Sequence, residues 1–386
     1  MPGAPAERCS CYVVVGIDGR SLRQGSAARG VARYLRHFLA ALAGDERHRD
    51  IELRVLSFGA PEEPLPARAE AVSTRIPSRV LFGTAALAGR PRLDRVLGTP
   101  DVVWLPAVAP VALGGHTPVV LTVHDLSFET EPRDFSRYER LWHRLARPRK
   151  LAQRATLVVV PSAHTGRLVR ERWGVPDERV RLVRPGPGRP PATPASREAA
   201  DGGVGLPAGL EPLGYFLVVG ALEPRKRPDI ACDAHALARQ CGLKATLVFA
   251  GDGPLRARLR REGVVVLGRV DDTLLDVLYR NALCLVCPSR EEGFGFPPLE
   301  AAARGTPAVV SDIAVFEETL GDAALRFPSG DAAALAERLL EVERNPRLRD
   351  RLAAAAREVV AQLSWERAAA ELAAVFRAAA SMLREP

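Results

Sequence analysis

The sequence predicts an α/β protein built from two successive parallel sheets, each covered by helices. Three observations support this fold class. Continuous apolar runs typical of buried strands alternate with helical runs along the chain. A stretch rich in proline, glycine and alanine, residues 185–214, interrupts the alternation, and the same pattern starts again after it. The length of 386 residues suits two or three domains at roughly 100–200 residues each.

The first half contains apolar runs that we interpret as strands and two strong helical runs. The strands are expected at residues 12–18, 51–58, 101–107, 118–125 and 156–162. Helices are expected over 30–44 and about 133–153. Pro148 should kink or end the second of these helices, because a proline inside a helix removes a hydrogen bond and clashes with the preceding turn.

The second half repeats this architecture and ends in helices. Strands are expected at residues 215–221, 245–253, 264–270, 284–289 and 306–312. Helices are expected near 228–240, at 272–281, over about 331–361 and over 365–384, the last one preceded by Ser364 as its N-cap. We therefore divide the chain into a first domain over 1–187, a linker over 188–212 and a second domain over 213–364. In such α/β units ligands bind at the carboxyl ends of the strands.

Composition and charge exclude several classes of protein. Hydrophobic residues make up 47% and charged residues 26% of the chain, which is ordinary globular usage. No apolar run reaches the roughly 18–20 residues that span a bilayer, and the first residues do not read as a signal peptide, so we expect a cytoplasmic protein. Residues 1–200 hold 31 Lys and Arg against 20 Asp and Glu, but they contain no nucleic-acid-binding motif, so we expect no nucleic-acid partner.

The six cysteines do not suggest a metal site. Cys284 and Cys287 form a C-x-x-C pattern inside an apolar, strand-like run, with no second such pattern and no histidine nearby. We therefore expect reduced cysteines in the core rather than zinc ligands.

The most informative segment is PSREEGFGFPPLEAAARG, residues 288–305. It reads as the end of a strand, a glycine-containing loop and a helix, with Glu292 in the loop and Glu300 in the first helical turn. Each carboxylate can accept hydrogen bonds from a pair of neighbouring hydroxyls, and the backbone N–H groups of 293–296 come at a helix start. This combination suits a sugar nucleotide; the alternative is that Glu300 caps the helix and Glu292 is solvated.

A basic turn, VVGALEPRKRPD at 218–229, also follows a strand and precedes a helix. Arg225, Lys226 and Arg227 at such a place suit a diphosphate, although a solvated basic turn remains the alternative. Two further strands end in GDGPL at 251–255 and GRVDD at 268–272, whose backbone groups suit a nucleobase slot.

These residues resemble the family 4 retaining glycosyltransferases of the GT-B fold. The second half carries the resemblance through GALEPRK, LVFAGDGP, LGRVDDTLLDVLYRNA, CPSREEGFGFPPLEAAARGTPAVVSD and LSWERAAAEL. The first half matches more loosely through GIDGR, GVARYL, TVHDLSFE and VVVPSAHT. The resemblance implies two Rossmann-like domains that face each other across a cleft, with the C-terminal helix, 365–386, crossing back to complete the first domain. The loop RQGSAARGVARY at 23–34 departs from the glycine-rich turn usual in the family.

The resemblance also implies roles for individual residues. Arg225 and Lys226 would hold the donor diphosphate, and Glu300 would hold the ribose hydroxyls. Glu292 and the amides of Gly293, Phe294 and Gly295 would hold the transferred sugar. His124, in the HDLSF string, would reach toward the sugar and the reacting bond, whereas the alternative for a lone histidine at a strand end is a structural role. Glu292 and His124 are the candidate catalytic residues.

The chain is therefore expected to move a mannose-, glucose- or deoxyhexose-like unit from a nucleoside diphosphate sugar to a saccharide, lipid-linked or small-molecule acceptor. No Asp-x-Asp pattern occurs, so we expect no metal; the nucleotide sugar is a substrate, and no cofactor is expected. The alternatives are a sugar-phosphate synthase on the same fold and a non-catalytic nucleotide-sugar-binding module.

A row of arginines at helical spacing indicates a possible contact with a membrane surface. Five arginines step by 4, 3, 4 and 3 residues, namely Arg133, Arg137, Arg140, Arg144 and Arg147. A basic amphipathic helix of this kind can lie on an anionic membrane surface, which would place the protein on the inner face of the membrane. The other interpretation is an ordinary helix with one core face and one solvated face.

Overall fold

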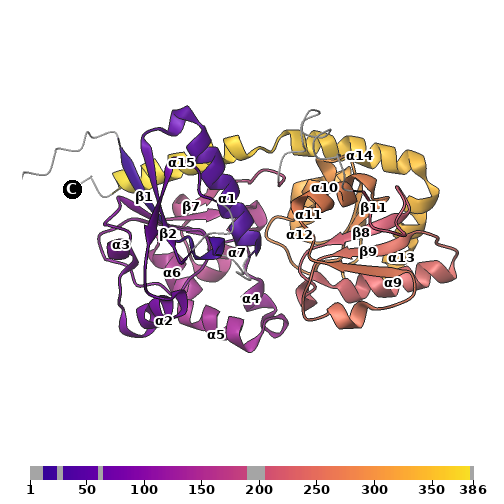
Figure 1. Ribbon diagram of the computed structural model, residues 1–386, viewed down its shortest axis with the longest axis horizontal. Coiled ribbons are helices and arrows are strands. Elements are labelled where there is room, and N and C mark those ends of the chain that lie inside the picture. Colours follow the sequence, from indigo (N-terminus) through magenta and orange to yellow (C-terminus); the bar gives the residue numbers. More distant parts are fainter. Residues whose placement is uncertain (1–11, 24–28, 60–63, 189–204, 383–386) are drawn as a thin grey trace, which may run out of the picture. The chain divides into compact units, whose positions relative to one another are not determined.

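The computed structural model describes residues 12–23, 29–59, 64–188 and 205–382, and Figure 1 shows its elements. These residues form two compact units. Unit 1 contains residues up to Phe128, Phe135–Pro185 and the segment from Trp365 onward; unit 2 contains Glu129–Asp134 and Gly186–Ser364. The expected linker is thus not separate throughout, because Leu206 and Leu210 pack against the core of unit 2.

Unit 1 is built on a parallel sheet with the order β3-β2-β1-β4-β5-β6-β7 among the described residues. Its strands are β1 (Val13–Ile17), β2 (Ile51–Ser57), β3 (Ala69–Ser73), β4 (Val102–Leu105), β5 (Val119–Thr122), β6 (Leu157–Val160) and β7 (Val180–Leu182). The helices of the first half are α1 (Arg29–Gly44), α2 (Ser78–Ala88), α3 (Leu93–Val96), α4 (Ser127–Thr130), α5 (Arg137–Ala146), α6 (Pro148–Arg154) and α7 (Ala163–Trp173).

The C-terminal helix α15 (Trp365–Ser381) packs within unit 1, against α1 and strands β1, β4 and β5 (Figure 1). Aromatic side chains make this contact: the ring of Trp365 lies 5.2 Å from that of Phe38, and the ring of Phe376 lies 5.5 Å from that of Trp104. Arg377 adds a two-pronged ion pair to Asp50. Burying several aromatic side chains stabilises this packing more than the ion pair at the surface does.

Unit 2 is built on a second parallel sheet with the order β10-β9-β8-β11-β12-β13 among the described residues. Its strands are β8 (Tyr215–Val219), β9 (Thr246–Ala250), β10 (Val264–Gly268), β11 (Cys284–Cys287), β12 (Ala308–Ser311) and β13 (Leu325–Phe327). Its helices are α9 (Pro228–Gln240), α10 (Asp272–Asn281), α11 (Phe296–Ala302), α12 (Ala314–Leu320), α13 (Ala332–Arg344) and α14 (Pro346–Ala361). The expected pair of parallel α/β sheets is confirmed.

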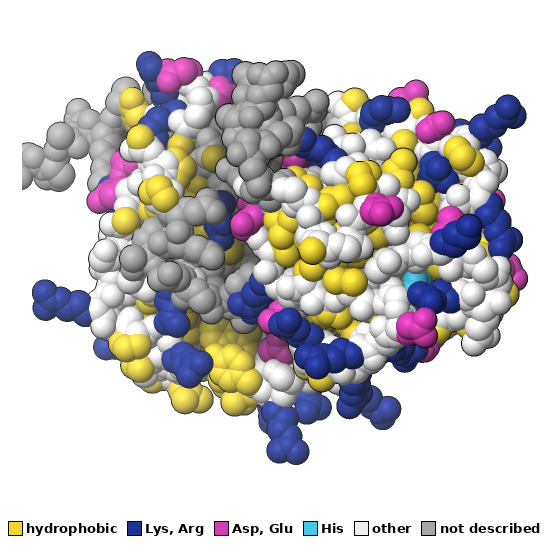
Figure 2. Space-filling view, turned by 45° about the vertical axis from the view of Figure 1, so that its right-hand side comes forward, with side chains coloured by type: hydrophobic (Ala, Val, Ile, Leu, Met, Phe, Trp, Pro, Cys, Tyr) yellow, Lys and Arg dark blue, Asp and Glu magenta, His cyan; other side chains and the backbone are white. Residues whose placement is uncertain are grey.

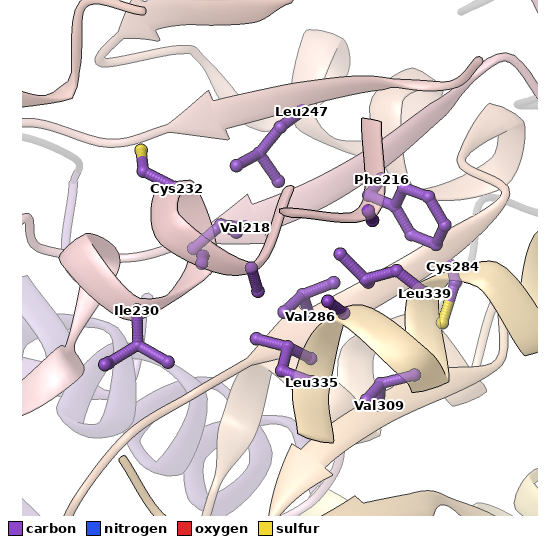
Figure 3. Packing of buried hydrophobic residues seen from close by; sticks show 14 of the residues in the cluster. Phe216, Val218, Ile230, Cys232, Leu247, Cys284, Val286, Val309, Leu335 and Leu339 are labelled. Carbon is purple, nitrogen blue, oxygen red and sulfur yellow. The ribbon is translucent and has the colours of Figure 1, made fainter. Parts of the chain in front are cut away.

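Helices cover both faces of this second sheet, because successive side chains of a strand point to opposite faces. Phe216 and Val218 of β8 pack with α9 and α13 on one face, as Figure 3 shows with Ile230 and Leu335 nearby. Tyr215 and Leu217 pack on the other face, with α10, α11 and α12. The two layers hold β8 and β11 rigidly at the centre of the sheet.

The structure differs from the expected elements at the sheet edges and in the long helical runs. The edge strands β3, β7 and β13 were not expected, because short edge strands that are partly exposed lack a continuous apolar run. The run 331–361 is two helices, divided at Asn345 and Pro346.

The expected helix over 133–153 is also divided. Ser136 and Glu139 form a capping box that starts α5, and Arg147 ends it in the left-handed region at φ 47° before Pro148 begins α6. Arg133 lies in a separate 3₁₀ turn, so the arginine stripe on the helix is shorter than expected.

Candidate active site

The basic turn and the Glu292 loop meet at the centre of the unit 2 sheet. β8 and β11 are parallel neighbours, and the chain runs outward from β8 to β9 and β10 on one side and from β11 to β12 and β13 on the other. The connections that follow β8 and β11 therefore lead toward opposite edges of the sheet. Open α/β sheets bind ligands at such a point, beside the carboxyl ends of the two strands. The turn after β8 carries Arg225 and Lys226, and the loop after β11 carries Glu292.

Glu292 is a buried carboxylate held by two partners. Its side chain is only 8% exposed, Lys226 Nζ contacts Oε1, and Ser289 Oγ donates to the same oxygen at 2.7 Å. A carboxylate removed from water needs a cation and hydrogen-bond donors, and here it has both. The structure thus pairs two residues that the sequence analysis had assigned to different parts of the donor, the sugar and the diphosphate.

Arg225 is tied to the same loop through its backbone. Its carbonyl accepts a hydrogen bond from Arg290 N at 2.9 Å, so the basic turn and the Glu292 loop are joined directly. The Arg225 side chain reaches Glu223 at 3.2 Å and is 21% exposed. Arg227, by contrast, pairs with Asp229 on α9. The basic turn therefore offers Arg225 and Lys226 near the loop, while Arg227 is engaged on its own helix.

The loop between Glu292 and α11 is shaped by a glycine and two phenylalanines. Gly295 has φ +83°, and a Cβ on it would lie 2.6 Å from the ring of Phe316, so a larger residue would clash with the core. Phe294 is 3% exposed and packs edge-on against Phe296, with ring centroids 5.4 Å apart. Its side chain is a core anchor, which leaves the backbone of 293–295 as the part that can serve a ligand.

Glu300 lies on α11 and is 3% exposed. The sequence analysis expected Glu300 in the first helical turn. Because α11 begins at Phe296, Glu300 is instead its fifth residue, lies beyond the first turn and does not cap the helix. Tyr279 Oη donates to its Oε2 at 2.8 Å. Gly188, with φ +73°, lies so close that a Cβ there would be 2.6 Å from Glu300 Oε1.

His124 belongs to unit 1 and follows strand β5. Its Nε2 lies 2.8 Å from the carbonyl oxygen of Pro106, and since a carbonyl can only accept, Nε2 carries the proton. Burial lowers the pKa of His124, although the hydrogen bond to Pro106 opposes that shift. The ring is therefore neutral at physiological pH, and its Nδ1 is an acceptor. Asp125, the next residue of the motif, accepts from Ser127 N at 2.9 Å and so shapes the start of α4.

Three contacts of these residues were not anticipated from the sequence: those of Ser289, Tyr279 and Gly188. Ser289 could have been suspected, since it stands three residues before Glu292 in the same loop. Tyr279 and Gly188 lie 21 and 112 positions before Glu300, and no local pattern links them to it.

An ion pair in unit 1 was also not anticipated. Asp18 and Arg20 pair after β1, and Arg20 also donates to the Val108 carbonyl at 2.9 Å. The string GIDGR was their only signal in the sequence.

Cysteine chemistry and metal binding receive no support at this site. Burial, together with the nearby Glu292 carboxylate, raises the pKa of the Cys287 thiol to about 12, so the thiol stays protonated. Within the ranges that the structure describes, no group of three His, Cys, Asp or Glu side chains is arranged to hold a metal ion. Metal-independent chemistry remains a prediction.

Comparisons with known proteins agree with this architecture. Residues 28–186 match the family described as "Glycosyltransferase Family 4", and residues 210–359 match "Glycosyl transferases group 1". A D-inositol 3-phosphate glycosyltransferase of Saccharomonospora viridis is 32% identical over 257 residues, covering 61% of this chain and 58% of the relative. A phosphatidyl-myo-inositol mannosyltransferase of Mycobacterium leprae is 34% identical over 167 residues, covering 41% of this chain and 45% of the relative.

The matched region thus spans about half the length of these curated relatives. Among solved structures, a sucrose-phosphate synthase of Thermosynechococcus elongatus superposes with a TM-score of 0.70 at 19% identity, over 96% of this chain and all of that one. A likeness at such low identity concerns the fold alone. Because the two family models match the two halves in order and together cover most of the sequence, the chain belongs to the group 1 and family 4 glycosyltransferases, which have the GT-B fold.

Proposed function

We propose that the protein transfers a hexose from a nucleoside diphosphate sugar to an acceptor hydroxyl, with retention of the anomeric configuration and without a metal ion. The observation that carries this proposal is the pairing of Lys226 with Glu292 where β8 and β11 lie side by side, with Glu300 on the helix that follows the Glu292 loop. A cation for a phosphate and two carboxylates for hydroxyls are the groups that a nucleotide sugar requires.

Arg225 and Lys226 bind the diphosphate and stabilise the charge that develops on it as it leaves. Lys226 already contacts Glu292, but an ammonium group has three donors and can serve a phosphate oxygen as well. Fixed cations at the leaving group do the work that a magnesium ion does in other phosphate chemistry, because they are aimed at the charge before it forms.

Glu292 and the backbone of Gly293, Phe294 and Gly295 bind hydroxyls of the transferred sugar, and Glu300 binds the ribose diol. His124 contributes a neutral ring whose Nδ1 accepts a hydrogen bond from a sugar or acceptor hydroxyl, since Nε2 is engaged by Pro106. The proposed role of His124 is therefore that of an acceptor and not of a proton donor.

Retention follows from attack on the face that the leaving group occupies. The bond between the anomeric carbon and the phosphate oxygen breaks, the acceptor oxygen bonds to that carbon, and the acceptor proton passes to the departing phosphate. The alternative, Glu292 as a covalent nucleophile, is disfavoured by its contacts with Lys226 and Ser289, which withdraw charge from Oε1.

The acceptor class is proposed from the relatives' names and is the finer part of the proposal. Two relatives are named for inositol-containing acceptors, and one of them for mannose. We therefore propose a mannose-like hexose and a polyol, saccharide or lipid-linked acceptor. A phosphorylated acceptor is the second candidate, because one of these relatives is named for D-inositol 3-phosphate.

A peripheral membrane location is proposed from the exposed face of α5, in a cytoplasmic protein. Arg137, Arg140 and Arg144 are exposed there, and Tyr138 and Leu141 between them are 57% and 53% exposed. Exposed apolar side chains flanked by arginines suit an anionic lipid surface. On the face drawn in Figure 2, Lys and Arg side chains are scattered among other residues and do not form one continuous stripe. Within the described ranges, no helix is long and apolar enough to cross a membrane.

The test of the function starts with ligands. We expect UDP-, GDP-, ADP- or dTDP-linked hexoses to raise the Tm, with one base clearly preferred, and the preferred donor to label inositol, inositol phosphate or a saccharide acceptor. The anomeric configuration of the product, read by NMR, should match the donor. Binding of a nucleotide sugar with no transfer to any acceptor class would favour the non-catalytic module, and the absence of any nucleotide binding would overturn the proposal.

A further inference from the structure

A buried tyrosine on the neighbouring helix holds the carboxylate of Glu300. Tyr279, on α10, is 1% exposed and donates its hydroxyl to Glu300 Oε2 at 2.8 Å. Hydrogen bonds to a charged acceptor are stronger than those between neutral groups. A donor supplied by a rigid aromatic side chain therefore fixes where this carboxylate points.

Tyr279 is itself held by two further contacts. Its carbonyl accepts a hydrogen bond from Thr306 Oγ1 at 2.5 Å, and the Arg304 guanidinium carbon lies 5.3 Å from the centre of its ring. Arg304 also donates to the Glu300 carbonyl at 3.0 Å and to Asp276 Oδ1 at 2.6 Å. Since Asp276 and Tyr279 share α10, Arg304 locks α10 and α11 together around the tyrosine–carboxylate pair.

The opposite side of the carboxylate faces the chain that enters unit 2. A Cβ on Gly188 would lie 2.6 Å from Glu300 Oε1, whereas Tyr279 contacts Oε2. The two oxygens thus face different surroundings, an aromatic donor on one side and a side-chain-free backbone on the other. Gly188 has φ +73°, and any larger residue there would clash with the Glu300 side chain, so the backbone at 188 packs directly against the carboxylate.

We propose that Tyr279 is a positioning residue that orients Glu300 toward the ribose diol, and that it thereby makes the site select ribonucleotides over 2′-deoxyribonucleotides. This inference rests on the proposed role of Glu300 in binding the ribose. A carboxylate fixed in place loses a paired hydroxyl when the 2′-OH is absent, and a buried oxygen left without its partner costs affinity. A carboxylate that is free to turn adjusts to the deoxyribose and discriminates less.

The experiment measures Kd by titration calorimetry for GDP, UDP and ADP, each beside its 2′-deoxy counterpart, using the full chain. The base that binds most tightly is used for the variants. We expect the wild type to prefer the ribonucleotide by about 10-fold or more, the scale of one hydrogen bond to a charged group. In Tyr279→Phe this preference should fall to about 2–3-fold, because the phenylalanine ring keeps the packing but lacks the donor.

Tyr215→Phe is the matched control. Tyr215 is also fully buried in unit 2, and its hydroxyl donates at 2.6 Å to a backbone carbonyl, that of Leu278, instead of a carboxylate. Leu278 keeps a second partner, Ala282 N, so the variant should fold. Its ribose preference should equal that of the wild type, even if its Tm falls as much as that of Tyr279→Phe.

The variant Glu300→Gln separates the role of Glu300 in binding the ribose from the role of Tyr279 in positioning Glu300. If Glu300→Gln abolishes the ribose preference and Tyr279→Phe leaves it unchanged, Tyr279 only packs and the positioning role is wrong. If Glu300→Gln leaves the preference unchanged, the ribose role of Glu300 fails, and the inference about Tyr279 fails with it. Equal losses of preference in Tyr279→Phe and Tyr215→Phe would show a general effect of destabilising unit 2 and would also overturn the proposal.

Discussion

The carboxyl edges of the two sheets use their polar residues differently. In unit 2 the side chains pair with one another across separate connections, Lys226 with Glu292 and Tyr279 with Glu300. In unit 1, Arg20 pairs with the neighbouring Asp18, but His124 and Arg20 also bond to backbone, to the carbonyls of Pro106 and Val108. A ligand can replace one partner of a side-chain pair and bind the other. A side chain that is bonded to backbone instead holds a loop in place. The difference is consistent with the proposal that unit 2 binds the donor, and unit 1 presents a neutral His124 fixed by its backbone contact.

Two histidines show how position decides the role. His124 and His235 each have Nε2 within 2.9 Å of a backbone carbonyl, and burial lowers the pKa of both. His124 follows the carboxyl end of β5, while His235 on α9 contacts Ala245, just before β9 begins. Parallel sheets bind ligands at the carboxyl end, so only His124 is a candidate for function.

The largest effect is expected from Lys226→Ala. Removing the cation leaves the charge on the departing phosphate without its main partner, and kcat should fall by about 10²–10³-fold, as for other lost transition-state contacts. Steady-state kinetics with the preferred donor would measure this loss. Lys244→Ala is the control, because Lys244 is an exposed lysine of the same unit, and its kcat should not change. Equal kcat values in the two variants would contradict the role of Lys226.

The next effect compares the two histidines. His124→Ala should lower kcat by about 10²-fold, the scale of one contact that tightens in the transition state, with the Kd for the nucleoside diphosphate nearly intact. His235→Ala should lower the Tm and leave kcat per folded molecule unchanged. Kinetics beside thermal unfolding decide between them: if His124→Ala also keeps its kcat per folded molecule, His124 only supports the end of β5.

A smaller effect concerns stability and pH. Burial lowers the pKa of His235 below its unfolded value of about 6.5, so below that pH the unfolded chain binds a proton that the folded chain does not. The free energy of unfolding therefore holds its full value above about pH 7 and falls as the pH drops from 6.5 toward the folded pKa. Denaturant unfolding at pH 7.5 and 5.5 should show a smaller loss of stability on acidification in His235→Gln than in the wild type. Equal losses would mean that His235 titrates alike in both states.

A chelator is expected to leave the turnover rate unchanged. In the proposed mechanism Arg225 and Lys226 supply the positive charge at the leaving group, so turnover in excess EDTA should equal turnover without it. An initial-rate assay is sufficient. A loss of rate that magnesium or manganese restores would refute the metal-independent mechanism and reduce the basic turn to a supporting role.

Much of the fold could be predicted, because its signals are local. The central strands are continuous apolar runs, and Pro148 ends the helix before it as expected. The break at Pro346 and the capping box at Ser136 were missed, although both are local signals. The edge strands β3, β7 and β13 were missed, because an edge strand that is half in solvent has no such run. Arg133 was wrongly placed on the α5 stripe, because periodicity alone does not show where the first helical turn begins.

The sequence by itself determined the two α/β halves, the basic turn and the Glu292–Glu300 string, since each depends on neighbours within about a dozen positions. Only the tertiary structure decided that Lys226 pairs with Glu292, that Tyr279 holds Glu300 and that Gly188 faces the same carboxylate. The physical reason is that buried charges must find partners wherever the packing brings them. Which donor reaches which carboxylate depends on how the helices cover the sheet, and no spacing along the chain encodes it.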